Sequence, residues 1–77
     1  MLKNLRPINL EGINNSNVYL DDEDEKIYIE IEYTKEDRMS KSGKSMLITT
    51  TNGNQRISIF GFQDVYLNLN LYKFINE

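Results

Sequence analysis

The sequence has no cysteine and no histidine, and these two absences exclude much chemistry. Without cysteine there is neither a disulfide nor a thiolate metal site. Without histidine the chain lacks the commonest metal ligand and the commonest general base near neutral pH. A chain of 77 residues also seldom encloses a pocket of enzyme size. We therefore expect no cofactor, no metal site and no enzymatic activity.

Long hydrophobic runs are also absent. Residues 1–7 lead into no apolar stretch, so we expect neither a signal peptide nor a membrane span. We therefore expect a cytoplasmic protein. The length predicts one domain over residues 1–77. A chain this short hides only about 60% of the surface that its unfolded form exposes, so we expect oligomerisation, with a homodimer as the simplest case.

Charge is unevenly distributed along the chain. Residues 1–32 hold three bases and eight acids, whereas residues 33–77 hold six bases and four acids. Much of the acidity lies in the five consecutive carboxylates of residues 21–25, which like-charge repulsion should keep solvated as a turn between two strands. A calcium-binding loop requires a glycine at its bend, and this run has none. We therefore predict no calcium site.

Secondary-structure signals are mainly those of β-strands. Residues 26–33 alternate strictly, with isoleucines and Tyr33 on one face, which predicts a half-buried strand. Shorter strands are expected around residues 8–10 and 17–20. Residues 34–37 permit at most one short helical turn. The fold class is therefore mainly β, a small antiparallel sheet or barrel of about five strands.

Residues 45–74 predict a three-strand meander, with strands at about 45–51, 55–61 and 65–74. Asn52-Gly53 is a strong hairpin signal, because a type I′ turn needs positive φ at both central residues. That turn places Ile48 opposite Ile57. In the next connection, Gly61 opposite Val65 keeps apolar residues facing one another, and a slip of one residue would not.

This register assigns a core row and an outer row. The core row is Met46, Ile48, Ile57, Ile59, Leu67 and Leu69. The outer row is Leu47, Thr49, Arg56, Ser58, Phe60, Tyr66, Asn68, Asn70 and Tyr72. In this register Phe60 faces Tyr66 and Arg56 faces Asn70, so aromatic rings and amides share one face.

The segment before the meander is basic. It carries Lys35, Arg38, Lys41 and Lys44 among small hydroxyl residues and Gly43. The residues Gly43-Lys44-Ser45 imitate the end of a phosphate-binding loop, but the motif also needs an earlier glycine and a following helix, so we exclude it. The alternative for this segment is a flexible polar connection between strands.

A basic rim beside exposed aromatic rings is typical of β proteins that bind single-stranded DNA or RNA. The sequence therefore predicts a nucleic-acid-binding protein with little sequence preference. The predicted binding residues are Lys35, Arg38, Lys41, Lys44, Arg56, Phe60, Tyr66, Asn68, Asn70 and Tyr72. The bases would contact phosphates, and the rings would stack on bases.

Two alternatives remain open from the sequence. The N-terminal segment or a second copy of the chain would cover the aromatic face if that face is structural. Alternatively, the chain is a small protein-interaction module, an inhibitor or adaptor of the kind that mobile elements encode. Such a module would use its sheet face, or would present its acidic run to a basic partner.

Overall fold

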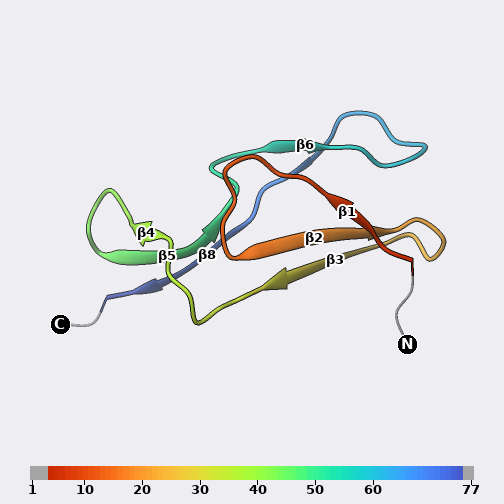
Figure 1. Ribbon diagram of the computed structural model, residues 1–77. Coiled ribbons are helices and arrows are strands. Elements are labelled where there is room, and N and C mark those ends of the chain that lie inside the picture. Colours follow the sequence, from red (N-terminus) through yellow and green to blue (C-terminus); the bar gives the residue numbers. More distant parts are fainter. Residues whose placement is uncertain (1–3, 76–77) are drawn as a thin grey trace.

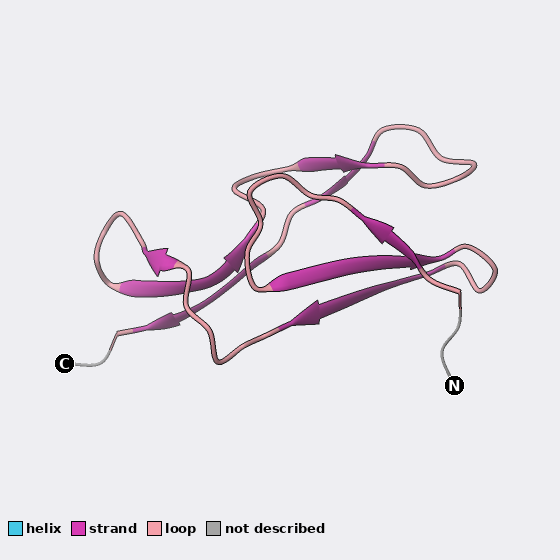
Figure 2. Cartoon of the chain, viewed as in Figure 1, coloured by secondary structure: helices cyan, strands magenta, loops and turns pink. Residues whose placement is uncertain are grey.

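The computed structural model describes residues 4–75, and all of its regular structure is β (Figures 1 and 2). The strands are β1 Arg6–Ile8, β2 Ser16–Asp21, β3 Lys26–Ile31, β4 Arg38–Met39, β5 Ser45–Thr50, β6 Gln55–Ile57, β7 Val65–Leu67 and β8 Asn70–Phe74. They form three antiparallel sheets, in the orders β1-β2-β3, β4-β5-β8 and β6-β7. The mainly β class is thus confirmed, and the described strands do not close into a barrel.

The first sheet is built around the β2–β3 hairpin, whose turn is the acidic run. Asp21 lies opposite Lys26, and Asp21 Oδ1 accepts hydrogen bonds from the amides of Glu23 (3.1 Å) and Asp24 (3.0 Å). Glu25 completes the turn with φ of 56°. The run therefore connects two strands as expected, but its first carboxylate is buried in the turn instead of solvated.

The second sheet joins the basic segment to the end of the chain. Arg38 lies opposite Leu47, and Leu47 lies opposite Tyr72, so these three side chains share a face. Pairing between β5 and β8 shifts by one residue between Leu47 and Thr49, a β-bulge at Ile48. No helical turn forms at residues 34–37, because the Asp37 amide donates to the Leu47 carbonyl (2.8 Å).

The predicted hairpin between β5 and β6 is wrong, although its turn conformation is correct. Asn52 and Gly53 both have positive φ, 57° and 104°. Thr51, however, donates its amide to the Leu69 carbonyl (3.0 Å), and its own carbonyl accepts from Gln55 Nε2 (2.9 Å). The side chain of Gln55 thus replaces the backbone partner that a hairpin would supply, and the chain turns a corner into another sheet.

The predicted register of the next two strands is also wrong. β6 pairs with β7 through Ile57 opposite Val65, not Gly61 opposite Val65. The connection is longer because Phe62 donates its amide to the Ile59 carbonyl (3.0 Å), closing a β-turn within it. The shift is an even number of residues, so the predicted faces of β6 and β7 survive it.

The apolar core is small. Within residues 4–75 the buried apolar side chains are Val18, Leu20, Ile48 and Ile57. The rest of the predicted core row, Met46, Ile59, Leu67 and Leu69, is half-buried. The strand at residues 26–33 ends at Ile31, and it is largely exposed instead of half-buried. The described chain measures 46 × 31 × 16 Å, so it is too thin for a thick core.

Polar contacts join the first two sheets around Thr49. This side chain was predicted to face outward, but it is 0% exposed because the bulge at Ile48 turns it inward. Its hydroxyl donates to the Asn14 carbonyl (2.6 Å), so Ser16 Oγ donates to Thr49 Oγ1 (2.8 Å). Beside them, Asn15 Nδ2 donates to the Ile48 carbonyl (2.8 Å). We call the contacts of residues 14–16 with residues 48 and 49 the polar seam.

We predict that Thr49→Val lowers the free energy of unfolding by about 1–3 kcal/mol, because it keeps the shape and leaves buried polar groups without their partner. Urea denaturation followed by circular dichroism measures this change. Thr34→Val is the matched control at an exposed position, where a change within about 0.5 kcal/mol is expected. Equal effects of the two substitutions would contradict the importance of the polar seam.

Candidate functional site

The aromatic residues proposed from the sequence lie at the surface. Phe60 is 92% exposed, Tyr66 is 53% exposed and Tyr72 is 50% exposed. They do not form one row, however. Phe60 lies in the loop between β6 and β7, and Tyr66 faces Arg56 instead of Phe60. Tyr72 belongs to another sheet, where it contacts the ring of Phe74 edge to face at a centroid distance of 5.7 Å.

Several of the predicted phosphate-binding bases are engaged within the chain. Lys35 Nζ lies 3.3 Å from Glu32 Oε2, and Arg38 binds Asp37 (3.1 Å) and the side chain of Asn52. Arg56 binds Asp64 at 3.3 Å, and does not face Asn70. Within residues 4–75, Lys41 and Lys44 have no acidic side chain within ion-pair distance. Among the predicted binding bases, these two lysines have the most freedom to bind a ligand.

The predicted amides are also engaged. Asn68 Nδ2 donates to Asn54 Oδ1 (3.0 Å), and Asn70 Nδ2 donates to Asn68 Oδ1 (3.0 Å). Asn70 in turn accepts a hydrogen bond from the hydroxyl of Thr50. This ladder of side chains ties the end of β5 to the start of β8, and a ligand would have to displace its members to read them.

The predicted residues therefore divide between two ends of the molecule. Figure 1 shows the β4–β5 loop, which carries Lys41 and Lys44, at the left end, and the loop carrying Phe60 at the right end. The acidic turn between β2 and β3 also lies at the right end. The predicted residues therefore do not form the one continuous surface that the sequence suggested.

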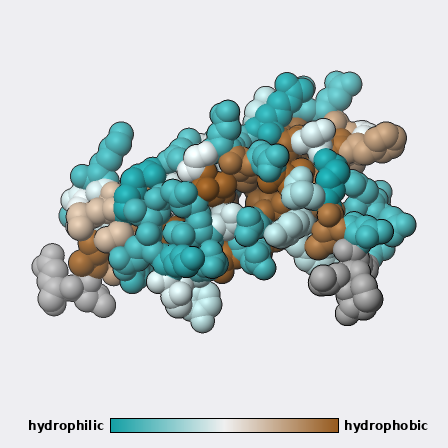
Figure 3. Space-filling model, viewed as in Figure 1, coloured by the Kyte–Doolittle hydropathy of each residue, from teal (hydrophilic) through white to brown (hydrophobic). Residues whose placement is uncertain are grey.

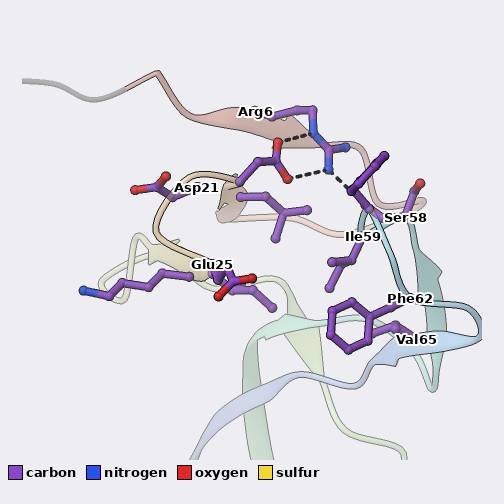
Figure 4. Close-up of a pocket in the computed structure, with 12 residues that line it drawn as sticks. Arg6, Asp21, Glu25, Ser58, Ile59, Phe62 and Val65 are labelled. Atoms are coloured by element: carbon purple, nitrogen blue, oxygen red, sulfur yellow. Dashed lines mark hydrogen bonds and ion pairs between the residues drawn. The ribbon is translucent and has the colours of Figure 1, made fainter.

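An apolar cleft lies at the right end, between the β2–β3 hairpin and the β6–β7 loop. Its volume is about 900 Å³. Its apolar lining is Leu20, Ile27, Ile59, Phe60, Phe62 and Val65, and its charged lining is Arg6, Asp21, Asp22, Glu25 and Lys26. In Figure 4, Ile59 and Phe62 point toward its interior from the loop. On the face drawn in Figure 3, hydrophobic residues reach the surface across the middle of the molecule.

The local sequence explains one wall of the cleft. Residues 59–62 form a β-turn, in which Gly61 has φ of 85° while Phe60 keeps a negative φ, the pattern of a type II turn. Glycine is favoured at that position, and the turn displays a phenylalanine on each side of it. The signal Phe60-Gly61-Phe62 was visible in the sequence. Its role was missed because residues 59–61 were assigned to a strand.

Arg6 connects the two walls of the cleft through an ion pair with Asp22 and a hydrogen bond to the Ser58 carbonyl. Arg6 Nε binds Asp22 Oδ2 (3.0 Å), Nη2 binds Asp22 Oδ1 (3.2 Å), and Nη2 also donates to the Ser58 carbonyl (3.2 Å; Figure 4). The hydrogen bonds from Arg6 lower the pKa of the Asp22 carboxyl, and they raise the pKa of the guanidinium. Because both side chains are about half exposed, the pair orients the loop more than it stabilises the fold.

No group of three or more acidic side chains within residues 4–75 is arranged to hold a metal ion. The described chain contains no helix of the length and hydrophobicity that crossing a membrane would require. Comparisons with protein families, with curated proteins and with solved structures found no match to this chain. The function of the candidate site is therefore inferred from its geometry alone.

We predict that Arg6→Gln raises the pKa of Asp22 back toward its ordinary value of 3.8. The folded pKa is lowered, so this pair's contribution to stability is complete above the ordinary value and is lost as the pH falls through the lowered value. Titration of the side-chain carboxyls by NMR measures the change. Arg56→Gln, which removes the exposed pair with Asp64, should leave Asp22 unchanged.

Proposed function

We propose that this chain is a protein-interaction module without catalytic activity, and that the apolar cleft is its docking site. The observation that carries the proposal is the exposure of large apolar side chains around a concave surface, above all Phe60 and Phe62. Concave apolar surfaces with a polar border are typical of docking sites. Because folding needs no disulfide, the chain suits the cytoplasm, which is the compartment we propose.

The border of the cleft suggests the chemistry of the partner. The five carboxylates of residues 21–25 adjoin the apolar lining, and the cleft residues include Asp22 and Glu25. Arg6 and Lys26 offset part of this charge but leave the border acidic. A complementary partner is therefore a segment with one or two large apolar side chains next to lysine or arginine. This partner chemistry agrees with the alternative drawn from the sequence, a protein-interaction module that presents its acidic run to a basic partner.

We predict that peptides selected from a random display library against the immobilised chain contain an apolar residue flanked by basic residues. Phe62→Ser should weaken their binding about tenfold or more, because burying such a side chain contributes about 1.5–3 kcal/mol. Fluorescence anisotropy with a synthetic selected peptide measures the affinity.

Phe74→Ser is the matched control, since Phe74 is an exposed phenylalanine of the second sheet. Peptides that bind Phe62→Ser as tightly as the wild type would place the docking site elsewhere. Failure of any peptide to become enriched would remove the support for a docking cleft.

Binding of single-stranded DNA or RNA is a second candidate, favoured by one specific arrangement at the other end of the molecule. The Ile75 amide donates to the Lys44 carbonyl (2.9 Å), so the pair of rings of Tyr72 and Phe74 lies next to the loop that holds Lys41 and Lys44. Lysines beside exposed rings are the elements that single strands require. The loop keeps its shape through Ser40, whose carbonyl accepts from the Gly43 amide (3.0 Å).

We predict that, if this second candidate is correct, a fluorescent oligothymidine binds with an affinity that falls with salt, by a logarithmic slope of about 0.7 per phosphate contact. The double variant Lys41→Glu with Lys44→Glu should abolish binding. Arg6→Glu with Arg56→Glu changes the net charge equally but lies in the other two sheets, so it should retain most of the affinity. No binding at low salt would eliminate this candidate.

A further inference from the structure

Strand β3 has one unpaired border. It is the outer strand of its sheet, and within residues 4–75 its strand neighbour is β2. The Glu32 amide donates to the Asn15 carbonyl (2.8 Å), and antiparallel pairs alternate between bonded and non-bonded partners. Tyr28 and Glu30 therefore also bond to β2. The amides and carbonyls of Ile27, Ile29 and Ile31 point away from β2, toward the unpaired border.

The apolar face of the first sheet also stops abruptly at this border. Val18 and Leu20 on β2 are 2% and 3% exposed, whereas Ile29 and Ile27, which lie directly opposite them on the same face, are 41% and 44% exposed. The face is therefore apolar across both strands but covered over only one of them. A further strand beside β3 would extend the sheet and place more side chains next to the isoleucines on the same face.

The other border of the same sheet is protected against such pairing. Strand β1 has three residues and contains Pro7, which has no amide to donate. Strand β3 has six residues, no proline and three isoleucines. Natural edge strands that remain unpaired are usually short, charged or interrupted by proline. By length and proline content β1 is a closed edge and β3 is open to a partner, and the charged side chains of β3 lie on the face opposite its isoleucines.

We propose that the occupant of this border is a second copy of the same chain, paired antiparallel through β3 with Ile29 on the twofold axis. In this register Ile29 faces Ile29 of the second copy, and Ile27 faces Ile31. These pairs are the ones with outward amides and carbonyls, so the two borders satisfy each other's hydrogen bonds. The result is a continuous sheet of six strands, in the order β1-β2-β3-β3-β2-β1.

Charge complementarity supports this register. It places Lys26 opposite Glu32 of the second copy, and symmetry repeats that pair at the other end of the strand. In a register centred on Glu30, the two Glu30 carboxylates would oppose each other. A register centred on Tyr28 would place Lys26 opposite Glu30, but it would bring Glu25 opposite Ile31. Glu25 has φ of 56° and is not extended, so that register forms fewer hydrogen bonds.

This inference goes beyond the proposed docking of a partner, because its contacts are backbone groups of β3 on the outer border. The Ile27 side chain lines the cleft, whereas its amide and carbonyl lie in the plane of the sheet and point toward the unpaired border. A dimer therefore leaves the wall formed by residues 59–62 accessible. The two proposals also fail separately, since peptide binding and self-association are measured by different experiments.

Single-cysteine variants test the register directly, because the chain has no cysteine of its own. Sedimentation of the wild type should give twice the chain mass of 9.1 kDa. We predict that Ile29→Cys forms a covalent dimer on mild oxidation, since a bonded antiparallel pair has Cα atoms about 5.5 Å apart, within disulfide range. Tyr28→Cys should not, because in this register its two copies are diagonal neighbours about 7–8 Å apart.

Gln63→Cys, in the exposed β6–β7 loop, measures random collision. A covalent dimer of Tyr28→Cys but not of Ile29→Cys would overturn the register, and a wild-type monomer would overturn the dimer.

Charge reversal keeps the test independent of oxidation. Lys26→Glu should dissociate the dimer, and adding Glu32→Lys should restore it, while circular dichroism confirms that both variants are folded. If the double variant stays dissociated, the assigned pair is wrong. If the amides of β3 are protected from hydrogen exchange only after a selected peptide is added, another protein occupies the border.

Discussion

The buried hydroxyl of Thr49 fixes how the first two sheets meet. It accepts a hydrogen bond from Ser16 and donates one to the Asn14 carbonyl. One side chain therefore joins the start of β2 in the first sheet to the bulge of β5 in the second. In a chain with a larger core, apolar packing would set this relation. Here the core contains few buried apolar side chains, and directional hydrogen bonds have to supply the specificity.

The two uncovered surfaces have the same physical origin. A molecule 16 Å thick cannot bury both faces of its sheets, so apolar side chains collect where a sheet ends or a loop turns outward. The first situation gives the border of β3, and the second gives the cleft beside Phe62. Both surfaces are built from strand and turn positions, and Arg6 connects the walls of the cleft by binding both Asp22 and the Ser58 carbonyl. The exposed side chains are therefore held in defined positions.

Local structure could be predicted from the sequence, and the long-range pairing of strands could not. Alternation identified β3, and Asn52-Gly53 has the positive φ values that its turn type requires. The turn does not form a hairpin because the Gln55 side chain and the distant Leu69 carbonyl bond to Thr51, and no local rule contains the pairing with Leu69. The outward row was correct at Tyr66, because an even shift in register preserves faces, whereas Phe60 is exposed in a loop. It failed at Thr49, since a bulge reverses them, and the cleft was missed because its walls are far apart in sequence.

The uneven charge of the chain acquires a structural meaning in the proposed dimer. In a monomer, the acidic turn at residues 22–25 and the basic segment that begins at Lys35 lie at the two ends of β3. Antiparallel pairing about Ile29 brings the acidic turn of one copy beside the basic segment of the other, and it does so twice. The opposite charges of the two halves of the sequence then attract between copies, while a parallel arrangement would bring like charges together. Charge polarity along one strand therefore favours the antiparallel orientation over the parallel one.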